Sequence, residues 1–309
     1  MSREISNSLH VLPFYRHPEH LGTFKKIKIF IGSVGLLPIR VLLSPIGILP
    51  PYLLSFLPMT YNSLKYRLFT GSCRWGARFL LYLCGFYKLK VVDKRVVKEP
   101  TRLIISNHTS LFDFLVLIAV HDQVPCFICR SSVLSIPFFG RVAQKLGSLY
   151  STGTSGISTS LQKTLTKPGP PIAVFPEATC TNGDFIISFK TGAFVPGIPV
   201  LPMTFEYKYK YFSPSFESID GKLWLFRILS EFSHNCAVTI YPTLYPSEKE
   251  KMDPLLYAEN VQTFISDQLA IPVYATSRFN QLIYFDYLQN RLTYNEAHSR
   301  IYNKDAFNE

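Results

Sequence analysis

The feature that most restricts the fold of this chain is an apolar segment near its N-terminus, residues 27–57. Its sequence is IKIFIGSVGLLPIRVLLSPIGILPPYLLSFL, with Lys28 and Arg40 as its charged residues. The segment is long enough to cross a bilayer, but prolines interrupt any straight helix. Backbone that is not helical at membrane depth needs hydrogen-bond partners from protein or water. The prolines are Pro38, Pro45, Pro50 and Pro51.

Basic residues flank the apolar segment on both sides. Lys25 and Lys26 precede it, and Lys65 and Arg67 follow it. Positive charge at both ends favours the same, cytoplasmic side of a membrane for both ends. We therefore predict a re-entrant or hairpin membrane anchor over residues 27–60. A buried, proline-broken helical layer of the core and a single membrane crossing are the alternatives.

The segments on either side of this anchor differ from it. Residues 1–26 are polar and lack the apolar core of a secretory signal. Within residues 61–87, Arg67, Arg74 and Arg78 recur on one helical face, which predicts an amphipathic helix on the membrane surface. The alternative is an ordinary amphipathic helix packed on the rest of the domain.

The excess of positive over negative charge is confined to the first hundred residues. Charged residues make up 17% of the 309 residues, which is low for a soluble domain and favours membrane association. The net charge is +11; residues 1–100 hold 15 Lys and Arg against 4 Asp and Glu, and residues 101–309 hold 17 of each sign. This distribution fits a basic membrane-proximal region rather than a nucleic-acid binder, so no nucleic-acid partner is expected.

From residue 88 onward, predicted strands and helices alternate. The predicted strands are KLKVVD, TRLIISN, VPCFICR, PIAVFPE and VPGIPVLPMTFEY, and the predicted helices are SLFDFLVLIAVH and IPFFGRVAQKLG. This alternation predicts an α/β domain over residues 88–245, with a mixed, partly parallel sheet and flanking helices. We expect residues 246–309 to form a helical C-terminal extension. Sites in such sheets form where strands end, and both SNHTSLFD and FPEATCTNGD lie there.

An imidazole and a carboxylate stand five residues apart in SNHTSLFDF. His108 falls in the loop after a predicted strand, and Asp113 in the first turn of the next helix. The carboxylate can then accept a hydrogen bond from one ring nitrogen and leave the other as a base, which suits proton removal from an alcohol. Alternatively, Ser110 to Asp113 fits a helix capping box, in which Asp113 is structural.

No metal site is expected from the cysteines. Cys126 and Cys129 form a C-x-x-C, but they lie inside an apparent strand and no second pair or His cluster accompanies them. They are therefore interpreted as buried thiols. Scattered cysteines without a disulfide framework favour a reducing compartment.

The polar clusters belong to four blocks that follow one another along the chain: NHTSLFD, RSSVLSIPFFGRVAQKLGSLY, VFPEATCTNG and GIPVLP. In these blocks the chain resembles the glycerolipid acyltransferases, which carry N-H-x-x-x-x-D followed by F-P-E-G. Within that family it resembles the lysophosphatidylcholine acyltransferase branch. LLPIRVLL, FPEATCTNGDFIISFKTGAFVPGIPV and LYAENVQTFISDQLAIPV carry this second resemblance, which covers residues 27–275.

The resemblance implies an activity, acyl-CoA-dependent O-acylation of a lysophospholipid, with lysophosphatidylcholine or lysophosphatidylethanolamine as acceptor. It implies that His108 is the general base, that Asp113 orients it, and that the alkoxide attacks the thioester without a covalent acyl-enzyme. Acyl-CoA would be a co-substrate, with no bound cofactor or metal. The resemblance also implies substrate-binding residues: Asn107, Arg130, Phe175, Pro176, Glu177, Ala178, Thr179, Lys190 and Pro199. For Lys190, a solvated surface lysine is the alternative.

Three positions depart from the family pattern. Ala178 stands in place of the usual Gly, which costs energy if the backbone there has a positive φ. Cys180 stands where lysophosphatidic acid acyltransferases commonly have Arg, which disfavours a bare phosphomonoester acceptor. Gly153 stands near the place where the second block usually ends in Arg. Lysophosphatidic acid acyltransferase activity nevertheless stays open as an alternative.

A different class of function is also open. A group related to these enzymes keeps the acyltransferase scaffold and the hairpin anchor but serves as a membrane or lipid-droplet adaptor. Ala178 and Gly153 favour that alternative, whereas the intact His108, Asp113 and Glu177 favour an enzyme. For the enzyme, the expected location is the endoplasmic reticulum membrane, with both flanks of the anchor in the cytosol and the bilayer as a partner.

Overall fold

The computed structural model describes residues 3–17, 22–151, 157–209 and 212–302, so Gly153 lies outside the described residues. The helices are α1 (Arg3–Ser8), α2 (Thr23–Ile31), α3 (Leu37–Leu54), α4 (Leu64–Leu83), α5 (Asp113–Val120), α6 (Phe139–Leu146), α7 (Ile157–Leu165), α8 (Gly221–Ser230), α9 (Glu248–Met252), α10 (Pro254–Leu269), α11 (Arg278–Leu288) and α12 (Tyr294–Tyr302). The strands are β1 (Lys88–Asp93), β2 (Leu103–Ser106), β3 (Cys126–Arg130), β4 (Leu149–Ser151), β5 (Ile172–Val174), β6 (Ile186–Ile187), β7 (Val200–Lys208), β8 (Asn235–Ile240) and β9 (Val273–Tyr274). Short helical turns are η1 (Leu12–Phe14), η2 (Gly32–Leu36), η3 (Ser131–Ser135) and η4 (Thr191–Ala193).

Seven strands form one sheet in the order β1-β8-β7-β2-β5-β3-β4. Its neighbouring strands are parallel, except that β7 and β8 pair antiparallel. The predicted mixed, partly parallel α/β fold is therefore confirmed. A second, two-stranded sheet joins β6, which follows FPEATCTNGD, to β9, which precedes α11.

Helices cover both faces of the main sheet. Ile104 packs in a cluster with side chains of α4, α5 and α8, whereas its neighbours Leu103 and Ile105 pack in a cluster with side chains of α10. This division follows from the alternation of side chains along a strand. α10 therefore shares the core of the sheet, although it lies within the segment 246–309 that we expected as an extension.

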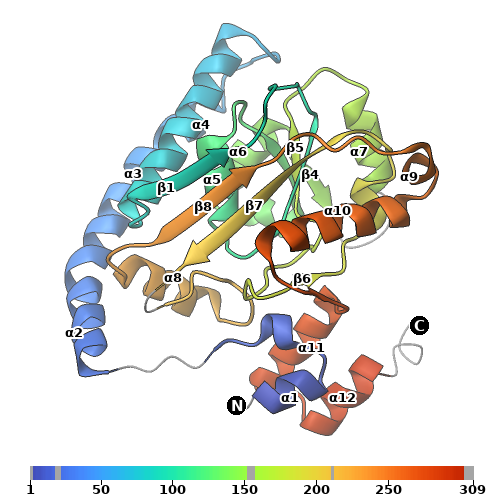
Figure 1. The fold of residues 1–309 in the computed structure, drawn as a ribbon. Coiled ribbons are helices and arrows are strands. Elements are labelled where there is room, and N and C mark those ends of the chain that lie inside the picture. The colour runs from blue at the N-terminus through green and yellow to red at the C-terminus, as the bar shows by residue number, and fades with distance from the viewer. Residues whose placement is uncertain (1–2, 18–21, 152–156, 210–211, 303–309) are drawn as a thin grey trace.

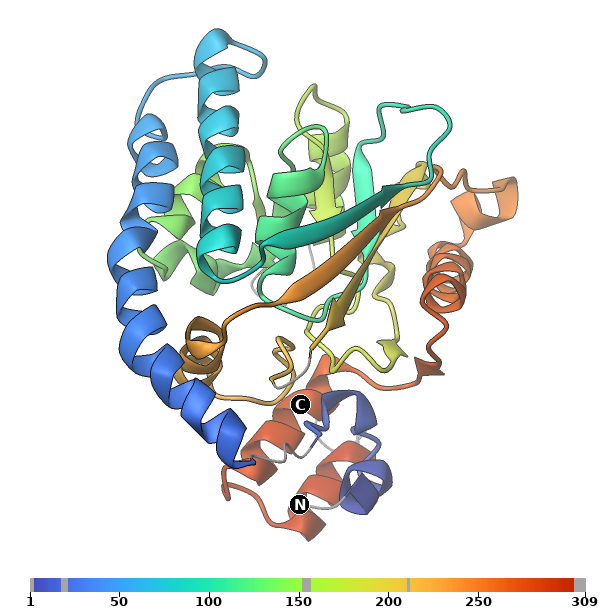
Figure 2. The ribbon, with the colours of Figure 1, turned by 60° about the vertical axis from the view of Figure 1, so that its left-hand side comes forward.

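The apolar N-terminal segment is one continuous helical stretch, Thr23–Leu54, made of α2, η2 and α3. The hairpin expected within residues 27–60 is replaced there by an unbroken helix that curves along the molecule (Figure 2). The prolines are accommodated locally: Pro45 has no N–H for the carbonyl of Val41, and the hydroxyl of Ser44 donates to that oxygen at 2.9 Å instead.

A helical hairpin is nevertheless present, formed by α3 with α4. The two helices run side by side in opposite directions, and the chain turns between them at residues 55–63 (Figure 1). They cross where Gly47 faces Gly76, since a Cβ on Gly76 would lie 2.2 Å from the carbonyl oxygen of Gly47. The turn is therefore later than the prolines suggested, and the two glycines allow the close crossing.

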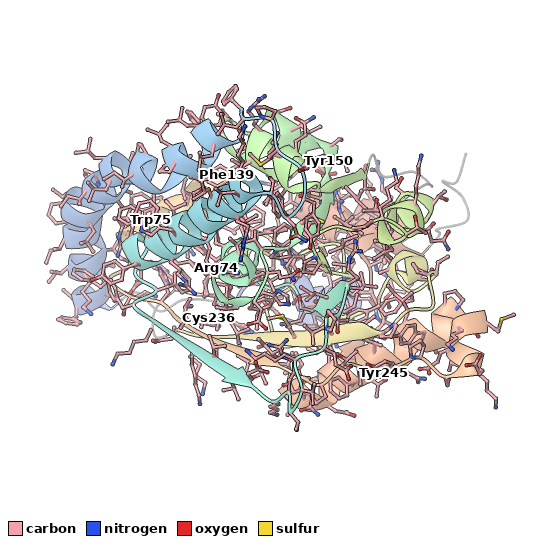
Figure 3. The ribbon with its side chains drawn as sticks, turned by 90° about the horizontal axis from the view of Figure 1, so that it is seen from above. Arg74, Trp75, Phe139, Tyr150, Cys236 and Tyr245 are labelled. Atoms are coloured by element: carbon pink, nitrogen blue, oxygen red, sulfur yellow. The ribbon has the colours of Figure 1, made fainter. Side chains whose placement is uncertain are left out.

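Two arginines of α4 point toward the domain. Arg74 and Arg78 donate hydrogen bonds of 2.7–3.0 Å to carbonyl oxygens at and just beyond the C-terminal end of α5. Those carbonyls lack partners within α5, and positive charge is favourable at that end of a helix. Trp75, next to Arg74 in Figure 3, is 48% exposed. Within residues 61–87, one face therefore packs on the domain as an ordinary amphipathic helix does.

Arg40 connects the apolar stretch to α8. It lies in the middle of α3 and is almost fully buried. Its guanidinium donates to the carbonyl oxygens of Leu229 and Glu231 at 2.8 and 2.6 Å, at the C-terminal end of α8. Because helix ends leave carbonyls unpaired, this side chain satisfies groups that would otherwise be buried without partners. The positive charge of Arg40, in the middle of an apolar segment, thus holds α3 against the domain.

The outer face of the Thr23–Leu54 stretch is apolar and exposed. Phe30, Val34, Leu42 and Leu53 are each between 62% and 77% exposed. Among the described residues, this stretch is the one helix long and apolar enough to cross a membrane. Of its most apolar 18 residues, 11% are buried. Apolar surface of this extent is uncommon on soluble monomers and marks an interaction site.

The two ends of the described chain pack together. Side chains from residues 9–14, α11 and α12 form one buried cluster with Ile187 of β6, which we call the terminal cluster (Figure 1). Its members are Leu9, Val11, Phe14, Ile187, Ile283, Tyr284, Ala297 and Ile301. Because Ile187 closely follows FPEATCTNGD, the terminal cluster lies directly against the segment that carries that motif.

Candidate active site

His108 and Asp113 lie together just after the C-terminal end of β2. The imidazole Nδ1 is 2.8 Å from Oδ2 of Asp113. His108 is 7% exposed, and Asp113 is fully buried. Within the described part of the chain, Nδ1 is the ring nitrogen with a hydrogen-bond partner. The structure thus forms the pair expected from the five-residue spacing, with Nε2 left for another proton exchange.

Asp113 is surrounded by hydrogen-bond donors. Its Oδ2 accepts from the backbone N–H groups of Thr109 and Ser110 at 2.9 and 3.0 Å, and its Oδ1 accepts from the hydroxyl of Tyr207. Burial and the negative charge of Asp113 raise the pKa of Tyr207 well above its ordinary value, so this hydroxyl stays a donor. The same carboxylate therefore closes the turn before α5, as in half of a capping box, and contacts the imidazole.

Glu177 holds the loop that carries His108 to the turn formed by FPEATC, residues 175–180, which we call the FPEATC turn. Its Oε1 accepts from the backbone N–H of His108 at 2.7 Å, and its Oε2 accepts from that of Ile187 at 3.2 Å. Burial raises the pKa of this carboxyl to about 8, against the opposing effect of the two hydrogen bonds. Glu177 is 1% exposed. It therefore acts on the position of the His108 backbone rather than on a substrate directly.

Aromatic rings enclose the imidazole. The ring of Phe175 stacks on that of His108, with centroids 4.2 Å apart and an interplanar angle of 20°. Phe114 meets the same imidazole edge-on at 5.5 Å. Such surroundings restrict the rotation of the imidazole and keep water from it, which strengthens its hydrogen bond to Asp113.

Ala178 occupies a left-handed backbone conformation, with φ of 58°. Its N–H donates to the carbonyl of Phe175 at 3.0 Å, which closes a tight turn between Phe175 and Ala178. The requirement for a positive φ that the usual Gly would meet is therefore real at this position. The chain accommodates Ala there because both neighbours of this residue, Glu177 and Thr179, are held by buried side-chain hydrogen bonds.

Of the other expected substrate-binding residues near the FPEATC turn, some are held by hydrogen bonds and others are exposed. The hydroxyl of Thr179 donates to the side chain of Gln281 in α11. The carbonyl of Pro176 accepts from the backbone N–H of Lys190 at 3.0 Å, and the Lys190 side chain is exposed. Within the described residues, the Lys190 ammonium has no protein partner, which agrees with either of the interpretations left open for it. Arg130 is the last residue of β3 and is exposed.

Two of the expected substrate-binding residues have other placements. Asn107 is buried, and its amide exchanges two hydrogen bonds, of 3.0 and 2.8 Å, with the backbone of Phe205. It therefore extends the pairing of β2 with β7. Pro199 lies at the opposite edge of the sheet from His108, because β2 and β7 pair in parallel with Leu103 beside Val200. A strand of five residues spans about 17 Å, so the structure does not bring Pro199 to the imidazole.

Two residues of the site were not expected from the sequence. Tyr207 contacts Asp113 from β7, and Gln281 contacts Thr179 from α11. Neither belongs to a motif with recognisable spacing, since each reaches the site through sheet pairing or helix docking between distant segments. Within the described residues, no group of three or more His, Cys, Asp and Glu side chains is placed to hold a metal ion.

Comparison with known proteins places this geometry in a family. The model of the family described as Acyltransferase matches residues 88–206. The lysophospholipid acyltransferase LPEAT1 of Arabidopsis thaliana is 30% identical, over 80% of this chain and 78% of that protein. A lysophosphatidylcholine acyltransferase of Drosophila melanogaster is 27% identical, over 85% of this chain and 53% of that protein. The chain thus spans about half the length of the Drosophila relative.

A solved structure shares the fold. The 1-acyl-sn-glycerophosphate (LPA) acyltransferase PlsC from Thermotoga maritima superposes with a TM-score of 0.56 and 16% sequence identity. The match covers 79% of this chain and 96% of that one. The sequence relatives, the family model and this fold agree with the resemblance that the four sequence blocks carry. The chain belongs to the acyltransferase family that includes the lysophospholipid and lysophosphatidylcholine acyltransferases.

Proposed function

We propose that this protein transfers an acyl group from acyl-CoA to the hydroxyl of a lysophospholipid, with His108 as general base and Asp113 orienting it. The observation that carries the proposal is the hydrogen bond between Nδ1 of His108 and Oδ2 of Asp113. A carboxylate at Nδ1 fixes the tautomer in which Nε2 is unprotonated. That nitrogen is then a base on an imidazole flanked by the rings of Phe114 and Phe175.

The proposed reaction has two linked changes. Nε2 of His108 takes the proton of the lysophospholipid hydroxyl as its oxygen attacks the thioester carbonyl of acyl-CoA. A C–O bond forms, the C–S bond breaks, and the imidazolium returns the proton to the departing CoA thiolate. Asp113 stabilises the imidazolium in between, and the three donors around Asp113 hold its carboxylate in place.

For the acceptor we propose lysophosphatidylcholine or lysophosphatidylethanolamine. Two of the relatives above have lysophospholipid or lysophosphatidylcholine in their names, and their similarity to this chain extends well beyond the family motif. The buried thiol of Cys180 occupies the position where a bare phosphomonoester would favour a guanidinium. This supports a phosphodiester acceptor over lysophosphatidic acid.

We propose that the protein works at a membrane surface, on the cytosolic side of the endoplasmic reticulum. The exposed apolar face of Thr23–Leu54 supports this location, and Lys26, at the start of that stretch, is exposed for contact with anionic headgroups. Arg40 and the α3–α4 crossing hold the inner face of the stretch against the domain. A helix held in this way lies along the protein and presents one face to the bilayer.

The catalytic proposal is tested by acyl transfer assays on the purified chain. His108→Ala is expected to lower kcat by about 10³-fold, because general-base catalysis contributes roughly 10²–10⁴-fold. The matched control is His298→Ala, an exposed histidine of α12, which is expected to leave kcat unchanged. Products are identified by mass spectrometry across several lysolipids and acyl-CoAs. Wild-type turnover by His108→Ala would contradict the mechanism, and no product from any pair would favour an adaptor.

A further inference from the structure

Two arginines, Arg130 of β3 and Arg278 of α11, lie beside the FPEATC turn. In the sheet, Cys126 of β3 is level with Ile172 of β5, which is level with Leu103 of β2. Four residues further along β3, Arg130 therefore emerges at the level of Asn107, the residue before His108. Arg130 is exposed at this edge of the sheet, where the parallel strands β2, β5 and β3 end.

Arg278 reaches the same place from the other end of the chain. It is the first residue of α11, and Gln281 follows it one turn later. Gln281 donates to the carbonyl of Cys180 at 3.4 Å and accepts from the hydroxyl of Thr179. Residues three apart share a helix face, so Arg278 lies on the side of α11 that faces the turn.

In the part of the chain that the structure describes, neither of the two arginines is paired with an acidic side chain. Within the described residues, neither Arg130 nor Arg278 forms an ion pair or a side-chain hydrogen bond, and Nε of Arg278 is buried without a partner. Burial and the positive charge of Arg130 lower the pKa of Arg278. The backbone N–H of Thr181 donates to the carbonyl oxygen of His108 at 3.0 Å, so the end of the turn lies directly beside the loop that carries His108. Two neighbouring guanidiniums without acidic partners favour a bound anion.

The geometry points to a phosphate site formed by Arg130 and Arg278, which binds a phosphate group of the substrates; the assignment of its ligand rests on the proposed function. A guanidinium binds phosphate oxygens through two parallel hydrogen bonds, which fixes orientation as well as charge. Arg278 lies outside residues 88–206, the part that the family model matches. The C-terminal α11 would thus supply a cation that Cys180, in the turn itself, does not.

The test uses the full chain with three substitutions. Arg278→Gln removes the charge, Arg278→Lys keeps the charge without the fork, and Arg291→Gln is the control. Arg291 lies just after α11, is exposed, and pairs with Asp286. We expect Arg278→Gln to raise the KM of one substrate about tenfold, as loss of a charge-assisted hydrogen bond does. Arg278→Lys is expected to recover part of that loss, and Arg291→Gln to match the wild type.

Separate arms identify the phosphate. The KM values of lysophosphatidylcholine and acyl-CoA are measured one at a time, with the other substrate saturating. Isothermal titration calorimetry measures the binding of hexadecylphosphocholine and of CoA without turnover. Weaker hexadecylphosphocholine binding by Arg278→Gln would identify the lipid phosphate, and weaker CoA binding a CoA phosphate; either supports the site.

The proposal is overturned if Arg278→Gln binds both ligands as the wild type does and keeps both KM values. It is also overturned if Arg278→Gln and Arg278→Lys lower kcat and the thermal midpoint together, with both affinities unchanged, since that pattern indicates a structural role. If the wild-type chain transfers no acyl group, the proposed function fails. The calorimetric comparison then still decides whether the two arginines bind phosphate.

Discussion

At the scale of single residues, Ala178 shows how this site holds an unfavourable backbone. Its φ of 58° lies in the left-handed region, where a side chain crowds the backbone. The conformation persists because its neighbours are fixed: Glu177 holds the backbone of His108, and Thr179 is bonded to Gln281. Strain of this kind is retained where the surrounding contacts over-determine the backbone. Ala178 therefore costs stability without displacing the loop that carries His108.

We expect Ala178→Gly to stabilise the protein by about 0.5–1 kcal/mol, because relief of strain outweighs the extra freedom of glycine in the unfolded chain. The matched control is Ala143→Gly in α6, where the backbone is helical and glycine costs about 0.5–1 kcal/mol. Urea denaturation of the two variants and the wild type gives the comparison. Equal destabilisation by both substitutions would show that the positive φ at position 178 carries no strain.

The residue scale also shows what sequence patterns can predict about a site. His108 and Asp113 are close in sequence, so the local turn into α5 brings them together and their spacing predicts the contact. Tyr207 and Arg278 lie about a hundred and more residues away. Their approach depends on the register of β7 and the docking of α11, which no local pattern encodes. The expected placement of Pro199 was wrong for the same reason, since strand register puts it at the far edge.

At the scale of elements, the α3–α4 pair depends on two glycines. The carbonyl of Gly47 lies where a Cβ on Gly76 would be, so the two backbones meet without side chains between them. Such contact brings the helix axes closer than ordinary side-chain packing allows. Glycine lowers helix propensity, so Gly76 weakens α4 as an isolated helix while it permits the packing of α4 on α3.

We expect Gly76→Ala to destabilise the protein by roughly 1–3 kcal/mol, because the new methyl group must push α3 and α4 apart. Gly71→Ala, five residues earlier in α4, is the matched control: nothing lies within 4 Å of its Cβ. There the higher helix propensity of alanine is expected to add about 0.8–1 kcal/mol. Thermal unfolding in a mild detergent, followed by circular dichroism, measures both variants. Two changes of the same sign would contradict the close crossing.

Elements were predicted unevenly for physical reasons. β1 coincides with the predicted KLKVVD strand, and β2, β3, β5, β7, α5 and α6 lie within or largely overlap their predicted segments, because apolar runs bounded by polar turns are local signals. Where we expected a hairpin within residues 27–60, the structure has a continuous helical stretch from Thr23 to Leu54. The expectation treated the prolines of α3 as helix breaks. A proline removes one hydrogen bond, and where a hydroxyl such as that of Ser44 replaces it, the helix continues.

At the scale of the whole molecule, two sides of the protein have different tasks. The apolar outer face of Thr23–Leu54 lies on one side, and the ends of the chain meet in the terminal cluster near the closing edge of the sheet (Figures 1 and 2). The terminal cluster contacts the FPEATCTNGD segment, where the backbone of Asn182 donates to the carbonyl of Pro13 at 2.8 Å. Composition indicated the first side, but contacts between chain ends have no compositional signal.

The last prediction concerns the apolar side as a membrane-binding surface. Leu42 and Leu53 are 77% and 62% exposed on α3, so replacing both by Glu leaves the packed face of the helix intact. We expect Leu42→Glu with Leu53→Glu to lower partitioning into phosphatidylcholine vesicles by about 10²–10⁴-fold, since each lost side chain contributes about 1.5–3 kcal/mol when buried. The control is Met252→Glu on α9, 86% exposed on the side of the molecule away from α3 (Figure 1). Vesicle flotation measures all three proteins, and circular dichroism checks their folds.

If the double variant floats as the wild type does, this face does not anchor the protein. If Met252→Glu alone abolishes flotation, the membrane contacts the opposite side of the molecule, and the proposed orientation is wrong.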